Sequence, residues 1–133
     1  MFVAMNRFKV RPGAERAFEE MWLNREVHLQ DSPGFLAFHM LKGEQAGEGE
    51  ERHRLYVSHT VWASEADLHA WTRSPAFRAA HAQAGRGASD SAPLTLGRPV
   101  FEGLAAIQSV ASDGTVAVDP ERLAEGVTVG KRG

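Results

Sequence analysis

The 133-residue sequence contains no cysteine. This absence excludes disulfide bonds, thiolate nucleophiles, iron–sulfur clusters and zinc sites built on cysteine. It also fits a protein that works in a reducing compartment, so we expect a cytoplasmic location. Metal binding would therefore depend on other side chains, among which are six histidines.

Long apolar runs and an excess of positive charge are missing as well. No stretch is long and apolar enough to cross a bilayer, and residues 1–10 carry Arg7 and Lys9 in place of the apolar centre of a signal peptide. The formal net charge is −2, so we do not expect the basic surface that is typical of nucleic-acid-binding proteins. The sequence therefore predicts neither a membrane segment nor a nucleic-acid partner.

Glycine-rich nucleotide-binding motifs are also missing. The glycines between residues 43 and 49 and between residues 85 and 87 lack phosphate-loop spacing and do not join a strand to a helix. No fingerprint of a flavin or nicotinamide site is found. If the protein catalyses a redox reaction, we expect its electrons to come from an external donor.

The residues that are present predict a small α+β domain. Hydrophobic residues make up 43% of the chain and charged residues 24%, which is the balance of a globular protein with one core. Alternating hydrophobicity predicts strands, and a 3.6-residue period predicts helices. The predicted strands span residues 1–10, 35–42, 54–62 and 98–110, and the predicted helices span residues 14–29, 64–71 and 75–84.

The resulting order, β-α-β-β-α-β, is that of the ferredoxin-like split β-α-β fold with an antiparallel sheet. Helices cover one face of such a sheet, so we expect a second copy of the chain to cover the other. Residues 1–110 form the predicted domain. Residues 111–133 form a C-terminal tail, in which Asp119 and Pro120 predict a single helical turn.

Asn6 is the first candidate for a functional residue. It lies in the middle of the first predicted strand and shares a face with four apolar residues, Phe2, Ala4, Phe8 and Val10. Burying an amide without a partner costs about 1–3 kcal/mol. Either a loop or backbone group satisfies this amide, or it points into a ligand pocket between the sheet and the helices.

His81 is the second candidate. At helical spacing it shares the apolar stripe of its predicted helix with Phe77, and alanines surround it at positions 79, 80, 82 and 84. Small neighbours allow a flat ligand to approach the helix, and neutral imidazole is a common ligand of iron. The alternative is a core histidine that is hydrogen-bonded to a backbone carbonyl.

Trp71 is the third candidate. It lies three residues after Leu68 on the preceding helix, so we expect its indole to face the core. A tryptophan at such a position can serve packing alone, and packing is the role that we expect for Trp22 and Trp62. The other histidines are not spaced as metal ligands.

Taken together, these residues resemble a known constellation. The order of elements is similar to that of the antibiotic biosynthesis monooxygenase (ABM) superfamily, whose members form dimeric α+β barrels. Within it, the chain resembles the haem-degrading monooxygenases of the IsdG type over about residues 1–110. The matching segments are Asn6, Ser32-Pro33-Gly34-Phe35, Thr60-Val61-Trp62, Ser64-Glu65, Ala70-Trp71 and the stretch from Pro75 to His81.

The resemblance implies a role for each candidate. His81 would be the proximal ligand of the haem iron, and Asn6 would donate its amide hydrogen to dioxygen on the opposite side. Trp71 would press on the porphyrin and hold it out of plane. Haem would be both substrate and cofactor, and the enzyme would open the porphyrin with O₂ and electrons from a reductase or a small reductant, releasing iron.

Two further residues are expected at the haem site. Arg25 lies on the inner stripe of the first helix, where relatives can carry arginine, and would bind a haem propionate. The alternative is a surface arginine whose stem covers the core. Phe77, on the stripe of His81, would contact the porphyrin. The resemblance also implies a homodimer.

Two other functions stay open at this point. One is a cofactor-independent ABM-type monooxygenase that acts on an aromatic or quinol substrate and does not need His81. The other is a haem-binding protein that does not turn haem over and does not need Asn6. A haemin titration separates the first alternative from the haem functions, and turnover with ascorbate separates an enzyme from a carrier.

Overall fold

The computed structural model describes residues 1–25, 28–79 and 93–129. The labelled elements are β1 (Phe2–Val10), α1 (Glu15–Leu23), β2 (Phe35–Ala46), β3 (His53–Trp62), α2 (Glu65–Thr72), β4 (Val100–Ala105), β5 (Gln108–Val110) and β6 (Val116–Val118). Short 3₁₀-helices lie at Leu29–Asp31, Gly49–Glu51 and Pro120–Arg122. Residues 75–79 also have helical backbone.

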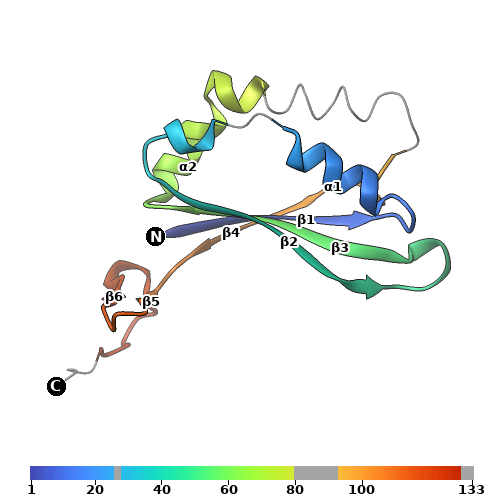
Figure 1. Cartoon of the computed structure of the whole chain (residues 1–133). Coiled ribbons are helices and arrows are strands. Elements are labelled where there is room, and N and C mark those ends of the chain that lie inside the picture. The colour runs from blue at the N-terminus through green and yellow to red at the C-terminus, as the bar shows by residue number, and fades with distance from the viewer. Residues whose placement is uncertain (26–27, 80–92, 130–133) are drawn as a thin grey trace.

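Four strands form one antiparallel sheet in the order β2-β3-β1-β4. The strand β1 lies in the centre, with Phe2 opposite Trp62 and Val10 opposite Arg54 on β3. In Figure 1, α1 and α2 lie on the same side of this sheet, and the β5–β6 hairpin extends away from it. This arrangement confirms the predicted ferredoxin-like α+β fold.

The helices pack on the sheet through two separate clusters. Beneath α2, the buried residues are Phe2, Ala4, Leu29, Trp62 and Leu68. Beneath α1, the buried residues are Val10, Phe18 and Tyr56. Both ends of the inner face of β1 are therefore covered, with Phe8 packed against the cluster beneath α1, whereas Asn6 lies between the two clusters. The candidate functional site lies in the gap between these two clusters.

The first helix is shorter than the amphipathic stripe predicts. The prediction of one helix over residues 14–29 is wrong, because α1 ends at Leu23. The side-chain amide of Asn24 donates to the carbonyl of Glu20 at 2.7 Å, which is how a short polar side chain competes with helical hydrogen bonding. Leu29 belongs to a separate 3₁₀-helix and is nevertheless buried.

Two strands also differ from their predicted bounds. β2 continues to Ala46, past the predicted end at residue 42, because an irregularity between Lys42 and Gln45 takes up the extra chain. The predicted strand over residues 98–110 is wrong, because β4 ends at Ala105 and residues 108–110 pair with β6. The expected turn after Asp119 is present as the 3₁₀-helix Pro120–Arg122.

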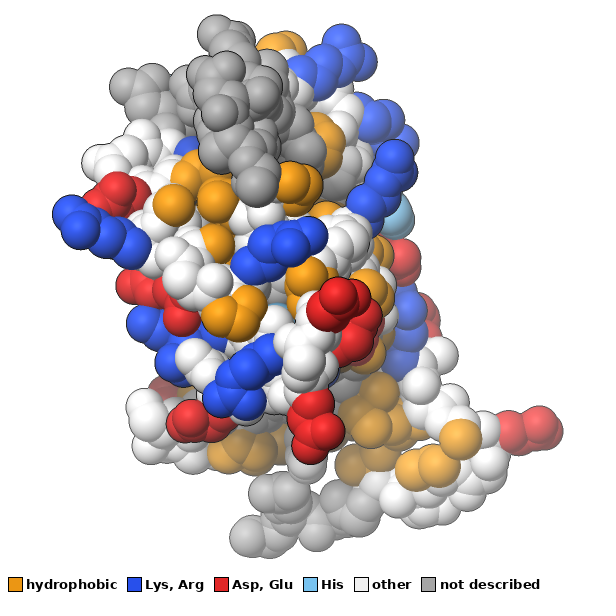
Figure 2. Space-filling view, turned by 90° about the vertical axis from the view of Figure 1, so that its right-hand side faces the viewer, with side chains coloured by type: hydrophobic (Ala, Val, Ile, Leu, Met, Phe, Trp, Pro, Cys, Tyr) orange, Lys and Arg blue, Asp and Glu red, His pale blue; other side chains and the backbone are white. Residues whose placement is uncertain are grey.

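The surface shows mixed charge. On the face shown in Figure 2, basic and acidic side chains are interspersed, which agrees with the formal net charge of −2. None of the described helices has the length and apolar character needed to span a membrane.

Candidate functional site

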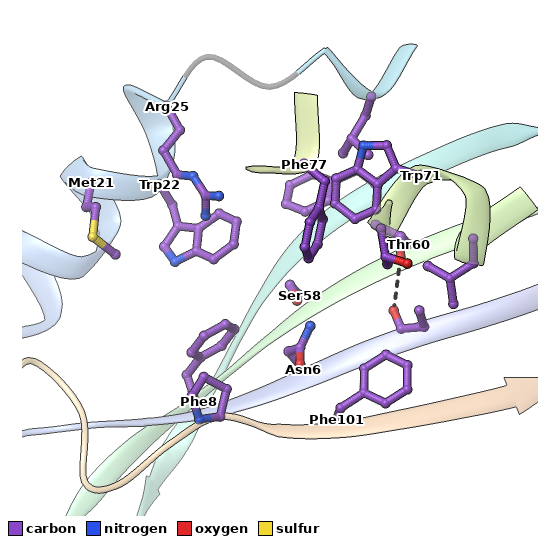
Figure 3. A pocket seen from close by; sticks show the side chains of 16 residues that line it. Asn6, Phe8, Met21, Trp22, Arg25, Ser58, Thr60, Trp71, Phe77 and Phe101 are labelled. Atoms are coloured by element: carbon purple, nitrogen blue, oxygen red, sulfur yellow. Dashed lines mark hydrogen bonds between the residues drawn. The ribbon is translucent and has the colours of Figure 1, made fainter. Parts of the chain in front are cut away.

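A cavity of about 430 Å³ lies between the middle of the sheet and the helices. This volume is in the range of small-molecule sites. Figure 3 shows Trp22, Trp71 and Phe77 on the helix side of the cavity, and Asn6, Ser58 and Phe101 on the sheet side. Aromatic side chains therefore border the cavity on both sides, an arrangement that suits a flat apolar ligand.

The sheet side of the cavity carries its polar groups. Asn6 lies directly opposite Ser58 on β3 and Phe101 on β4, so the three side chains share one face. Ser58 is only 6% exposed. Among the described residues, no hydrogen bond involves the side chain of Asn6 or Ser58, whereas Thr60 donates to the carbonyl of Ala4 at 3.2 Å. The amide and the hydroxyl are therefore available to a ligand.

Two helix caps hold the aromatic side of the cavity in place. The backbone N–H of Asp67 donates to the hydroxyl of Ser64, which confirms the predicted start of α2. The backbone N–H of Phe77 donates to the hydroxyl of Ser74 in the same way. These caps set the starts of the helical segments that carry Trp71 and Phe77.

The ring of Trp71 is packed on two sides. Its centroid lies 5.6 Å from that of Trp62 and 4.7 Å from that of Phe77, with the Phe77 ring edge-on at 84°. The indole N–H of Trp71 is buried and has no hydrogen-bond partner among the described residues. Trp71 is therefore a rigid wall of the cavity and offers one unused donor.

Arg25 brings a positive charge to the cavity. Its guanidinium carbon lies 4.2 Å from the centroid of the Trp22 ring. Burial lowers the pKa of this guanidinium below its ordinary value, because its charged form has lost part of its hydration. A carboxylate of the ligand at this point would offset that loss.

Trp22 was expected to serve packing alone, and this expectation is incomplete. The indole stacks on Phe38 at a centroid distance of 6.1 Å and meets Phe8 edge-on at 5.7 Å. It also lines the cavity. Trp62, in contrast, is fully buried and is a core residue as expected.

Four of the five predicted site residues line this one cavity: Asn6, Arg25, Trp71 and Phe77. The fifth, His81, lies outside the described residues, so its role stays a prediction. The sequence reasoning missed Ser58, Phe38 and Phe101. Ser58 gave no clear signal, because β3 has apolar residues on both faces: Tyr56 and Trp62 on the face of Ser58, and Val57 and Val61 on the other.

The described part of the chain offers no ready-made metal cluster. In residues 1–25, 28–79 and 93–129, no group of three or more histidine, aspartate or glutamate side chains could hold a metal ion. His39 and His59 face each other across β2 and β3 at a ring distance of 5.7 Å, but their face of the sheet is opposite to the cavity.

Comparison with known proteins places the chain in a family. The model of the antibiotic biosynthesis monooxygenase family matches residues 1–83. A haem oxygenase (staphylobilin-producing) from Staphylococcus haemolyticus is 32% identical over 94 residues, which cover 71% of this chain and 86% of that protein. A haem oxygenase (mycobilin-producing) from Mycobacterium tuberculosis is 38% identical over 80 residues, covering 60% of this chain and 70% of that protein.

Solved structures agree with this result. The haem-degrader MhuD from Mycobacterium tuberculosis with two haems in its active site is 24% identical, with a TM-score of 0.55 over 84% of this chain and 100% of that chain. A mutant of MhuD with two manganese protoporphyrin IX molecules per active site is 26% identical, with a TM-score of 0.57 over the same shares. The chain belongs to the antibiotic biosynthesis monooxygenase family and is related to its haem-degrading members.

Proposed function

We propose that the chain binds haem in the cavity and degrades it as a monooxygenase, using O₂ and electrons from a reductase or a small reductant. The observation that carries the proposal is the convergence of Asn6, Arg25 and Trp71 on one aromatic cavity. The relatives named as haem oxygenases support the choice of substrate. Bound haem would supply the iron that activates dioxygen.

The cavity residues fit a porphyrin. A flat macrocycle would lie between the rings of Trp71 and Phe77 on one side and Asn6, Ser58 and Phe101 of the sheet on the other. Arg25 would bind a propionate carboxylate, which compensates its partly buried charge. His81 follows Phe77 by four residues in the sequence, and we propose it as the axial ligand of the iron.

Asn6 would act as a hydrogen-bond donor in the cavity. Its amide lies among apolar neighbours, where a fixed donor stabilises negative charge more than it does in water. Trp71 would press on one side of the porphyrin. Trp62 and Phe77 contact its ring from two directions and would hold the indole in position against a bound porphyrin.

We also propose that the protein is a homodimer. The face of the sheet opposite the helices carries an apolar group made of Val3, Met5, Leu41, Val57, Val61, Val100 and Leu104, beside the polar residues Arg7, Lys9, His39, His59 and Glu102. Leu41, Val100 and Leu104 are each about half exposed. A second copy that packs on this face would bury these side chains and complete a barrel of two sheets.

Turnover tests the proposed activity. Haemin is added to the purified protein, ascorbate is supplied as reductant, and loss of the Soret band is followed together with iron release to a chelator. We expect wild type to degrade haem. We expect Asn6→Ala to bind haemin normally but to react on the order of 100-fold more slowly, because the donor is lost.

Asn24→Ala is the matched control, because Asn24 is an exposed amide that caps α1. We expect it to react like wild type. A wild-type protein that binds haemin and leaves it intact would refute the degrading activity and favour a carrier. Full activity in Asn6→Ala would refute the role of the amide.

A further inference from the structure

Ser58 stands out in the core. Among the described residues it is the one polar side chain in the buried class, with 6% of its surface exposed. It lies in the middle of β3, and its neighbours on the same face include the buried residues Tyr56 and Trp62. A strand at this depth favours apolar side chains, so the hydroxyl needs a physical reason.

The protein itself does not satisfy this hydroxyl. No hydrogen bond of Ser58 Oγ to another described residue exists, although Thr60 on the same strand donates to the Ala4 carbonyl at 3.2 Å. Unlike the indole N–H groups of Trp22, Trp62 and Trp71, the Ser58 hydroxyl is not sealed off from its surroundings, so a ligand can reach it and form a hydrogen bond with it. Ser58 lines the cavity, so such a ligand would lie there.

The side-chain amide of Asn6 is a second polar group beside the Ser58 hydroxyl. Asn6 and Ser58 face each other directly across β1 and β3, and facing side chains in an antiparallel pair have Cβ atoms about 4.5–5.5 Å apart. Figure 3 shows both polar groups on the sheet side of the cavity, between Phe8 and Thr60. One small polar group can therefore lie within reach of both the amide and the hydroxyl.

We propose that Ser58 and Asn6 form a two-residue hydrogen-bonding site for a small ligand of the haem iron. The Asn6 amide and the Ser58 hydroxyl each donate one hydrogen bond to that ligand. The proposal rests on the proposed function, because it presupposes haem in the cavity. The neighbours of the two groups in the cavity include the apolar side chains of Phe8, Phe38 and Phe101, and a hydrogen bond is stronger beside apolar groups than in water.

Fluoride binding to the haem-loaded ferric protein tests this site. Fluoride is a suitable probe, because it coordinates iron and accepts hydrogen bonds but cannot donate them. The matched variants are Ser58→Thr, which keeps the hydroxyl, and Ser58→Val, which has the same shape without it. We expect Thr to bind fluoride within about twofold of wild type and Val to bind it about tenfold more weakly, as loss of one hydrogen bond to a charged acceptor implies.

The variants are first titrated with haemin and melted thermally. We expect all of them to bind haemin like wild type, since Ser58 does not hold the porphyrin. Ser58→Ala provides a second variant without the hydroxyl if the β-branched side chains disturb packing. We also expect Asn6→Ala combined with Ser58→Val to lose more fluoride affinity than either single variant.

The possible failures are distinguishable. A wild-type protein without a saturable haemin spectrum would overturn both the haem function and this inference. Normal haemin binding with equal fluoride affinity in Ser58→Val, Ser58→Ala and Ser58→Thr would overturn the role of Ser58 alone. In that case the serine serves only to keep a small side chain beneath the ligand.

Discussion

At the scale of single residues, the site consists of polar groups that lie on an otherwise apolar face. Asn6 and Ser58 lie on the inner face of the sheet between two packed clusters. Arg25 brings a half-buried charge from the helix side. A ligand that offers a hydrogen-bond acceptor to the amide and the hydroxyl and a carboxylate to the guanidinium would match all three groups.

The charge of Arg25 gives a first prediction. We expect Arg25→Gln to weaken haemin binding about three- to tenfold, because a propionate loses its cationic partner. The measurement is a Soret titration of wild type and variant, repeated with haemin dimethyl ester, which has no propionate charge. With haemin dimethyl ester, wild type and Arg25→Gln should bind with equal affinity.

Arg16→Gln serves as the control, because Arg16 is an exposed arginine whose partner on α1 is Glu20. We expect it to bind haemin like wild type. An equal loss with haemin and with its ester would show that Arg25 acts through packing on Trp22 and not through charge.

Glu19 gives a pH-dependent prediction. The Lys42 ammonium and the Tyr56 hydroxyl, both hydrogen-bonded to its carboxylate, lower the pKa of Glu19 below its ordinary value. A carboxyl whose pKa is lowered in the folded state stabilises the fold above its unfolded pKa, and this contribution is lost as the pH falls through the folded pKa. The loss should therefore occur below the ordinary carboxyl range, about pH 4.

Urea unfolding of wild type and Glu19→Gln at several pH values measures this effect. We expect the variant to unfold at a lower urea concentration at pH 7, with the difference shrinking as the pH falls below about 4. Glu20→Gln, whose carboxylate binds Arg16 on the exposed side of α1, should show a smaller difference at pH 7. A constant difference between wild type and Glu19→Gln at all pH values would contradict the linkage.

The sequence predicts some of these residues and not others, for physical reasons. Asn6 could be found because it interrupts a clear alternation of apolar residues in β1. Ser58 was missed because β3 has apolar residues on both faces, so a polar residue within it does not identify the inner face. The cavity-lining role of Trp22 was missed because a half-buried indole has the same periodicity whether it packs or borders a ligand.

At the scale of elements, periodicity predicts which elements occur but not where all of them end. The stripe that suggested a helix over residues 14–29 is divided between α1 and a 3₁₀-helix, since a buried Leu29 satisfies the same pattern in either structure. The last strand was predicted too long because the hairpin signal Asp113-Gly114 was overlooked. Gly114 has φ +90°, and Thr115 donates its N–H to the Asp113 carboxylate at 2.8 Å.

Gly34 links the first half of the fold to α2. Its φ is +81°, and a Cβ atom at this position would overlap the side chain of Asp67 in the first turn of α2. We expect Gly34→Ala to destabilise the fold by more than the about 1–3 kcal/mol of left-handed backbone strain alone. The measurement is the free energy of unfolding in urea.

Gly114→Ala is the matched control, because Gly114 has φ +90° and open space around its Cα. This variant should show the backbone strain without the overlap. If the two alanine variants lose the same stability, the packing of this turn against α2 does not contribute.

At the scale of the whole molecule, the helices form one layer on one face of the four-stranded sheet. This arrangement has two consequences. The helices meet the sheet in two clusters and leave the cavity between them. The opposite face of the sheet carries several exposed apolar residues together with the Arg7–Glu102 ion pair, and in Figure 1 neither α1 nor α2 lies on it. The same architecture therefore provides a ligand site and a surface for a second copy.

The molecular mass of the protein in solution tests the proposed dimer. We expect sedimentation to give twice the chain mass of 14.5 kDa for wild type. Val61→Glu should shift the protein towards the monomer, because Val61 lies beside Val3 and Ala37 on the apolar face. Leu23→Glu, at an exposed position of α1, should leave the dimer intact. A monomeric wild type would contradict the dimer.

Haemin titration with visible spectroscopy tests the central claim most directly. Wild type, His81→Ala and the control His28→Ala are compared, His28 being an exposed histidine. The account predicts a saturable Soret band in wild type and in His28→Ala, and its loss or a strong shift in His81→Ala. The absence of a saturable band in wild type would contradict the haem function and favour a monooxygenase that needs no cofactor.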